Sequence, residues 1–278
     1  MSAEQFFTFP FPLSPSHMSD TVLYSIADGV ATITLNRPQV LNALDWEMIH
    51  QLRQAVERAE RDAKVRAVVL RGEGPAFLAG GDVSSFHANL ARMPGLVREG
   101  ATELHHAIMA MRGASKPVLA VVHGAVAGAG VSVMAAADLA LAAEGTKFSL
   151  AYSRIGASPD GGSTYFLPRL LGARRALEMM LLADTFDAQA ALRLGLVNWV
   201  VGAGELAAET AKLAGLLAQG PTAAFAETKR LVNRSYEQPL PAQLEAEMEA
   251  FARCAVTRDF AEGVTAFVEK RKPNFKGN

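Results

Sequence analysis

FLAGGD at residues 77–82 and GAVAGAG at residues 124–130 are two short, glycine-rich turns that decide the fold of this chain. Each follows an apolar run, AVVL at 67–70 and VLAVV at 118–122, and each precedes a segment that can be helical. Such strand-turn-helix units leave backbone N–H groups at the end of a strand, where they can point at a ligand oxygen. Two N–H groups that converge on one carbonyl oxygen form an oxyanion hole, so the pattern predicts stabilisation of an enolate.

Composition limits the classes to which the protein can belong. The chain has 278 residues, half of them hydrophobic, which is enough for one large domain with a sizeable core. The formal net charge of −1 gives no basic footprint for nucleic acid. Cys254 is the single cysteine, so an internal disulfide is excluded and a cytoplasmic location is expected. No apolar run is long enough to span a membrane, so we expect no membrane partner.

Hydrophobic periodicity predicts an α/β region followed by a helical one. Alternating apolar residues on either side of Asp28-Gly29 predict a hairpin over 23–35. Asp45 is a candidate N-cap for a helix whose apolar residues recur at helical spacing. The remaining predicted elements are strands at 67–70, 118–122 and 139–142, and helices near 102–112 and 163–171.

The same patterns divide the chain into three parts. Residues 1–20 make a poor signal peptide, because they lack a basic start and a clean apolar core, and we expect a flexible extension there. Residues 21–206 form the predicted α/β core. From 207 to 278 the pattern is helical only, which predicts helices that pack on the core or on a neighbouring subunit.

Four segments together resemble the enoyl-CoA hydratase/isomerase (crotonase) superfamily. They are LNRP with LNAL within 35–44, AFLAGGD at 76–82, the stretch from KPV to the second glycine turn at 116–130, and FVEKRK at 267–272. SPDGG at 158–162 and FLPR at 166–169 are most similar to the epoxyphenylacetyl-CoA isomerase branch. The resemblance implies an α/β fold with a crotonase-like ββα spiral core and a C-terminal all-helical trimerisation region. It also implies a homo-oligomer, either a trimer or a dimer of trimers.

The resemblance assigns roles to both glycine turns. It implies that the backbone N–H groups of Gly81 and Ala129 hold the enolate oxygen of an acyl-CoA thioester. The second position is often glycine in the superfamily, but alanine serves equally because only the amide is used. Taken singly, each turn could also be an ordinary strand-helix connection.

The general acid/base departs from the hydratase pattern. Hydratases of the superfamily have two glutamates, and Ser132 and Tyr152 occupy the matching positions here. Asp160 matches the aspartate of several isomerase branches, and one carboxylate suffices to move a proton from C2 to C4. We therefore expect an enoyl-CoA isomerase, for double-bond migration or ring opening, with Asp160 as proton shuttle. The competing interpretation is that Asp160 caps the helix predicted at 163–171.

Other functions remain as alternatives. A chlorobenzoyl-CoA dehalogenase of the superfamily pairs a histidine matching His105 with an aspartate matching Asp160, although its helical position favours a packing role for His105. An enoyl-CoA hydratase is a further enzymatic alternative. An acyl-CoA-binding scaffold without catalysis is the alternative of another class, because the two common carboxylates are absent.

Substrate binding is assigned by the resemblance alone. The residues implied are Val40, Leu41, Ala43, Ala79, Asp82, Val83, Tyr152, Phe267 and Lys270, the last two from the C-terminal helix. Lys270 could meet the 3′-phosphate of coenzyme A, or it could belong to a solvated basic tail. The scattered histidines have no metal-ligand spacing. We expect no metal, and no cofactor beyond the coenzyme A moiety of the substrate.

Overall fold

A mostly parallel sheet forms the centre of the protein in the computed structural model, which describes residues 20–278; the predicted extension at 1–20 lies, except for Asp20, outside these residues. The sheet has the order β1-β2-β3-β4-β6-β9, with β1 and β2 antiparallel and every later pair parallel. The strands are β1 Val22–Ala27, β2 Val30–Leu35, β3 Ala67–Gly72, β4 Val118–Val122, β6 Leu139–Ala143 and β9 Trp199–Val201. The hairpin and the three further strands predicted from the sequence are therefore confirmed.

A second, smaller sheet follows the second glycine turn. It has the order β5-β7-β8, from β5 Ala125–Ala127, β7 Lys147–Ser149 and β8 Phe186–Asp187. The sequence does not predict these strands, because each is too short to show alternation. The sheet matters for function because β5 holds the second glycine turn against the first.

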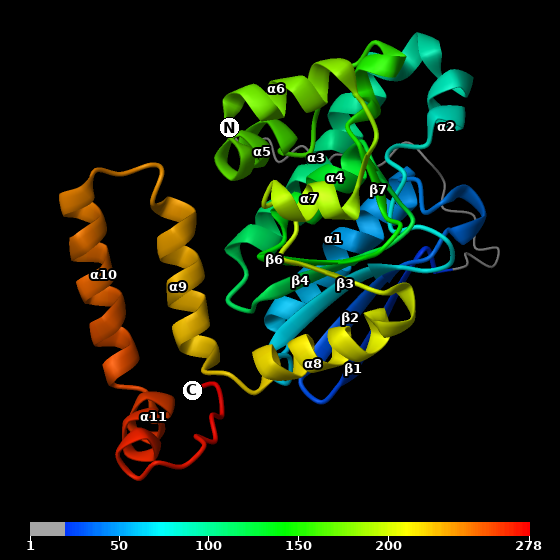
Figure 1. Ribbon diagram of the computed structural model, residues 1–278. Helices are drawn as coiled ribbons and strands as arrows, with labels where there is room; N and C mark the ends of the chain where they lie inside the picture. Colours follow the sequence, from blue (N-terminus) through cyan, green and yellow to red (C-terminus); the bar gives the residue numbers. More distant parts are fainter. Residues whose placement is uncertain (1–19) are drawn as a thin grey trace, which may run out of the picture.

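Helices cover both faces of the main sheet (Figure 1). One face packs against α1 Trp46–Arg61 and α3 Met93–Gly113, and the other against α8 Leu206–Ala218. Alternate residues of β3 serve the two faces: Val68 and Leu70 belong to the core with α1 and α3, and Val69 to the core with α8. The remaining elements of this part are η1 Pro38–Val40, α2 Val83–Ala88, η2 Leu90–Arg92, α4 Ala129–Ala136, η3 Ala151–Ile155, α5 Ser163–Leu171, α6 Ala173–Leu182, α7 Ala188–Arg193 and η4 Ala203–Glu205.

Capping and proline explain where the helices begin. Asp45 caps α1 as predicted, because its carboxylate accepts the Met48 N–H at 2.8 Å. The helix predicted near 102–112 begins earlier, at Met93, with Pro94 in its first turn. This extension carries the helix along the side of the glycine turns, so α3 becomes a wall of the site described below.

The last three helices extend away from the sheet (Figure 1). They are α9 Thr222–Arg234, α10 Leu240–Ala255 and α11 Arg258–Val268. The boundary predicted before residue 207 falls at the start of α8, which packs on the sheet, so the part that leaves the core begins with α9. Lys229 of α9 joins it to the core through Asp138 at 2.8 Å, and Asp259 holds the C-terminal tail by accepting the Lys276 and Gly277 amides.

Candidate active site

The two glycine turns lie against each other at the ends of their strands. Leu78 donates its N–H to Ala125 O at 3.2 Å and accepts the Ala127 N–H at 2.9 Å, so the turns are joined as in a parallel sheet. A Cβ on Gly80 would lie only 3.2 Å from Ala127 O, and Gly80 and Gly128 both have positive φ. Glycine at both positions therefore permits the close approach that places the next residues side by side.

Gly81 and Ala129 are those next residues, and both line the same cavity. Ala129 is the first residue of α4, where a helix leaves its N–H groups without intrahelical acceptors. Within residues 20–278, neither the Gly81 nor the Ala129 amide donates to a backbone carbonyl outside the regular elements. Two such donors that line one cavity are what an oxyanion hole requires, and the hole expected from the sequence stays a prediction.

The cavity has a volume of about 640 Å³, which is in the usual range of small-molecule sites. The turns form one side, and α1, α2, α3 and η3 form the others. Its lining includes Leu44, Trp46, Ile49, Ala79, Gly81, Val83, Phe86, Val97, Gly100, Ala101, Leu104, Ala129, Tyr152, Arg154, Ser158 and Asp160. Trp46 and Ile49 were not predicted. The sequence gives one hint that Trp46 and Ile49 line the cavity, namely their position in the first turn of the helix that Asp45 caps.

Asp160 lines this cavity and accepts hydrogen bonds from the side chains of three neighbours, Tyr152, Ser132 and Ser163. The Tyr152 hydroxyl donates to Asp160 Oδ1 at 2.6 Å, and the buried Ser132 hydroxyl donates to the Asp160 backbone carbonyl at 2.9 Å. No described side chain donates to Oδ2, which leaves that oxygen available to a substrate proton. The capping interpretation of Asp160 is wrong, because the N-cap of α5 is Gly162 and no side chain caps this helix.

Tyr152 is fixed as a hydrogen-bond donor. Burial, together with the negative charge of Asp160, raises the pKa of the Tyr152 phenol above its usual value. The neutral hydroxyl therefore persists at physiological pH and continues to donate to Asp160. Its hydrogen bond goes to a carboxylate, a type of bond that is shorter and stronger than a neutral one.

The described residues of the cavity lining include one carboxylate besides Asp160. Asp45 is the other acidic residue of the lining, but it caps α1 and pairs with Arg37 at 3.2 Å. Ser132 carries no carboxylate, and it packs closely against the loop that follows Asp160, since a Cβ on Gly161 would lie 2.9 Å from Ser132 Cβ. Asp160 is therefore the single carboxylate of the described lining that is free for proton transfer.

The predicted coenzyme A residues lie along one edge of the first turn. Ala79 donates its N–H to Leu41 O at 3.1 Å, which places the exposed Val40, Leu41 and neighbouring Ala43 beside the turn. Ala79 and the exposed Val83 line the cavity itself. Asp82 is occupied differently, because its carboxylate caps α2 at Ser85 and pairs with Arg37 at 3.2 Å.

The structure does not place His105 in the cavity. Its side chain is exposed on α3, and it is absent from the cavity lining, whereas Leu104, one position earlier, faces inward. One residue corresponds to roughly 100° around a helix, so Leu104 and His105 point to different sides. The predicted pairing of His105 with Asp160 is therefore not formed in this chain.

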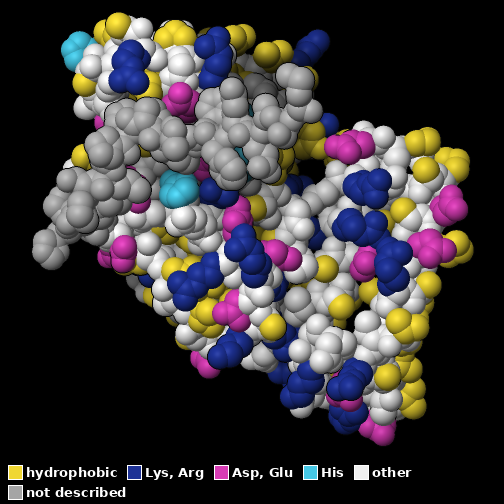
Figure 2. All heavy atoms as spheres, turned by 180° about the vertical axis from the view of Figure 1, so that it is seen from behind, with side chains coloured by type: hydrophobic (Ala, Val, Ile, Leu, Met, Phe, Trp, Pro, Cys, Tyr) yellow, Lys and Arg dark blue, Asp and Glu magenta, His cyan; other side chains and the backbone are white. Residues whose placement is uncertain are grey.

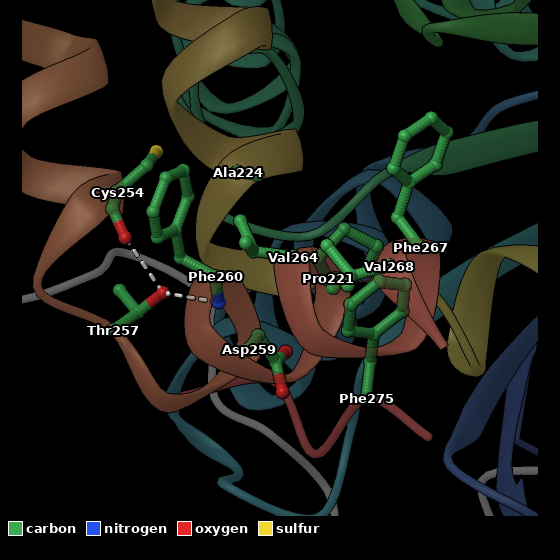
Figure 3. Close-up of a pocket in the computed structure, with 11 residues that line it drawn as sticks. Pro221, Ala224, Cys254, Thr257, Asp259, Phe260, Val264, Phe267, Val268 and Phe275 are labelled. Atoms are coloured by element: carbon green, nitrogen blue, oxygen red, sulfur yellow. Dashed lines mark hydrogen bonds between the residues drawn. The ribbon is translucent and has the colours of Figure 1, made fainter. Parts of the chain in front are cut away.

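Phe267 and Lys270 also lie outside the cavity within one chain. Both are exposed, and Phe267 borders a separate apolar hollow of about 360 Å³ at the base of the C-terminal helices. Figure 3 shows Phe260, Val264 and Pro221 around that hollow. Its one charged lining residue, Asp259, uses both carboxylate oxygens to hold the C-terminal tail. The hollow therefore has no free carboxylate among its described lining residues, and its one free titratable group is the Cys254 thiol.

Residues 20–278 contain neither a clustered metal site nor a membrane-spanning helix. No group of three or more histidine, cysteine, aspartate or glutamate side chains in this part of the chain is placed to hold a metal ion. Among the same residues, none of the helices combines the length and the apolar character needed to cross a membrane.

Known proteins resemble this chain over nearly its whole length. A sequence model of the enoyl-CoA hydratase/isomerase family matches residues 25–278. A Rhodobacter capsulatus protein named probable enoyl-CoA hydratase is 41% identical over 92% of this chain and 98% of its own length. The 1,2-epoxyphenylacetyl-CoA isomerase of Escherichia coli is 34% identical over 94% of this chain and 100% of its own. The crystal structure of an enoyl-CoA hydratase from a Polaromonas species superimposes with a TM-score of 0.88, at 35% identity, over 92% of this chain and 99% of that one.

Proposed function

Because the chain belongs to the enoyl-CoA hydratase/isomerase family, we propose that it moves a carbon–carbon double bond in an enoyl-CoA thioester, with Asp160 as the single proton shuttle. The observation that carries the proposal is the isolation of Asp160 as the only free carboxylate of the described cavity lining. The fold is the crotonase-like α/β fold of the family's solved structures.

The proposed reaction has two proton transfers. Asp160 Oδ2 removes a proton from C2 of a 3-enoyl thioester, and the electrons of the C–H bond move onto the carbonyl oxygen to form a dienolate. The Gly81 and Ala129 amides donate to that oxygen as its charge develops. The protonated Asp160 then returns the proton to C4, and the double bond comes to lie between C2 and C3. The atoms and electrons balance without an oxidant or reductant, so we propose that no cofactor beyond the coenzyme A moiety takes part.

Hydration is the second candidate, because the Rhodobacter capsulatus relative is named for it. Water addition by the two-glutamate route requires a second carboxylate, and Ser132 and Tyr152 supply none. Dehalogenation is weaker still, since the exposed His105 does not reach the cavity of its own chain. Isomerisation is the reaction for which the free groups of the cavity suffice.

We further propose that the chain works as a homo-oligomer built through its C-terminal helices. Leu244, Met248 and Phe251 follow one another on α10 at helical spacing and are all more than half exposed. Figure 2 shows apolar side chains along the outer edge of these helices. Such a stripe is typical of a face that is covered in the working assembly. A neighbouring copy could then bring its own C-terminal helix, with Phe267 and Lys270, to the coenzyme A groove.

An NMR experiment in D₂O tests the proposal. The wild type should convert a 3-enoyl-CoA to the 2-enoyl isomer and exchange its C2 protons, and Asp160→Asn should lose this by roughly 10²–10⁴-fold. Formation of a 3-hydroxyacyl-CoA by the wild type would instead establish a hydratase. Equal activity in wild type and Asp160→Asn would overturn the role of Asp160, and binding without any reaction in either protein would favour a scaffold.

A further inference from the structure

The cavity extends beyond the catalytic groups along one face of α3. The loop after Asp160 meets this helix at Ile108, since a Cβ on Gly161 would lie 3.5 Å from Ile108 Cδ1. Leu104, Gly100 and Val97 then line the cavity toward the beginning of α3. From Leu104 to Val97 the helix advances by roughly 10 Å. The space therefore continues well past the point where the α- and β-carbons of a substrate would react.

Trp46 and Gly100 form the wall at this distant part of the cavity. A Cβ on Gly100 would lie 1.7 Å from Cζ3 and 2.7 Å from Cη2 of the Trp46 indole. The ring therefore rests directly on the backbone of α3, and a methyl group at position 100 would force it to move. Gly100 is buried, and its backbone does not require a positive φ. Glycine is thus needed at position 100 because the indole ring approaches so closely. The backbone conformation alone would allow another residue.

The surfaces around this space are apolar. The side chains of α1, α2 and α3 that line the cavity are uncharged, and Ser85 is the only polar one among them. Phe86 closes the side next to the oxyanion donors, since a Cβ on Gly81 would lie 2.6 Å from Phe86 Cζ. A charged or strongly polar acyl terminus that lies against these three helices would lose its hydration there. The charged residues of the lining, Asp45 and Arg154, lie outside the three helices and are already engaged, Asp45 with Arg37 and Arg154 with Ala183 O.

We propose that the substrate carries an apolar acyl group longer than crotonyl, and that its far end lies against Trp46. This inference rests on the proposed function, because that function places the reacting carbons at Asp160. Gly100 is then a specificity-determining residue: it lets the indole lie back against α3 and so leaves room for the acyl tail. A straight alkyl chain and an aryl group are both apolar enough for this site, and the experiment below distinguishes between them.

Chain-length profiles test the proposal. The turnover of 3-hexenoyl-, 3-octenoyl- and 3-decenoyl-CoA is compared with the affinity for the unreactive hexanoyl-, octanoyl-, decanoyl- and phenylacetyl-CoA. Gly100→Ala should push the Trp46 indole into the cavity. Both kcat/KM and affinity should then fall by roughly 10–200-fold for the longest chains, with little effect on the shortest. Gly95→Ala is the matched control, since Gly95 lies on the same helix and a Cβ there would meet nothing within 4 Å.

A second substitution, at Trp46, keeps the proposal testable if Gly100→Ala fails to fold. Trp46→Leu, alone and combined with Gly100→Ala, should shift the preference toward longer chains and restore decanoyl-CoA binding to the double variant. Preferential loss of phenylacetyl-CoA over decanoyl-CoA in Gly100→Ala would identify the aryl group as the occupant.

An unchanged length profile in Gly100→Ala and Trp46→Leu, or an equal loss at all lengths, would overturn the proposal. A further outcome separates the two proposals. If no enoyl-CoA is isomerised, but Gly100→Ala still weakens the binding of long acyl-CoAs more than that of short ones, the proposed function fails. The assignment of the part of the cavity beside Trp46 to an apolar acyl tail then stands.

Discussion

Tyr152 donates a hydrogen bond to Asp160 Oδ1 over 2.6 Å, and this contact orients the one free carboxylate of the cavity. The phenol cannot act as a second carboxylate. Burial and the charge of Asp160 raise its pKa, so it remains a donor. Tyr152, which the resemblance matches to a hydratase glutamate, is thus a neutral donor to Asp160.

Tyr152→Phe should lower kcat and leave KM nearly unchanged. Losing the donor leaves the half-buried Asp160 carboxylate free to rotate, and loss of a hydrogen bond to a charged acceptor costs about 1–3 kcal/mol, or roughly 5–150-fold in rate. Steady-state kinetics with a 3-enoyl-CoA measure the effect. Tyr165→Phe is the control, because its hydroxyl contacts the exposed Glu237 at 3.0 Å and lies outside the cavity lining. A raised KM with unchanged kcat would instead show that Tyr152 acts only in substrate binding.

Gly130→Ala should damage both the oxyanion hole and the fold. A Cβ at this position would lie 2.2 Å from Leu78 O, so the start of α4 would have to move away from the first turn. Overpacking of this kind costs about 1–3 kcal/mol in the free energy of unfolding, and displacement of the Ala129 amide costs up to roughly 10²–10³ in kcat. Thermal unfolding and kcat are the two measurements.

Ala129→Gly is the matched variant for this test. It removes a methyl group next to Gly130 but keeps the amide that would hold the enolate oxygen, so its kcat should remain within a fewfold of wild type. A large loss of kcat in Ala129→Gly, with full activity in Gly130→Ala, would contradict the assignment of the second turn.

Local signals explain which parts of the fold could be predicted. Asp45 caps α1 as predicted, because a cap depends on residues three positions apart. The hairpin around Asp28-Gly29 forms for the same reason, with both turn residues at positive φ. The glycine turns were identified because close backbone approach requires glycine. These features are all determined within a few neighbouring residues.

Packing between distant segments decides the features that local signals leave open. His105 belongs to a correctly predicted helix, but the side on which it lies depends on how α3 packs, and the structure leaves it exposed. The sequence leaves a cap as the competing interpretation of Asp160, and only the Tyr152 and Ser132 contacts in the folded chain decide against it. Trp46 lines the cavity only because Gly100, far along the chain, admits its ring.

Lys229→Met should destabilise the junction between α9 and the core. Lys229 Nζ is nearly buried and donates to Asp138 Oδ2 at 2.8 Å and to Met111 O at 2.6 Å. Its removal leaves a partly buried carboxylate, at a cost of about 3 kcal/mol. This is the lower end of the range for such pairs, since Arg112 still lies 3.9 Å from Asp138. Urea unfolding at fixed protein concentration measures the change.

Lys212→Ala provides the comparison for that variant. Lys212 is mostly exposed and pairs with Glu209 on the same helix at 2.9 Å, so its loss should cost less than about 1 kcal/mol. Equal effects of the two substitutions would show that Lys229 does not hold α9 to the core.

Glu227→Gln should reveal an acid-sensitive link between α9 and α10. Arg253 of α10 donates to both Glu227 oxygens, at 2.9 and 3.0 Å, and with Arg230 it lowers the pKa of Glu227 from 4.5 to about 2. A carboxylate whose pKa is lower in the folded state stabilises the fold above its unfolded pKa, and this contribution is lost as the pH falls toward the folded value. The difference in Tm between wild type and Glu227→Gln should therefore be constant near neutral pH and disappear between about pH 4.5 and pH 2. Glu245→Gln, at an exposed glutamate of α10 that forms no ion pair with the described residues, should show no such dependence. A Tm difference that persists unchanged to pH 2 would mean that side-chain packing, and not the charge of Glu227, joins the two helices.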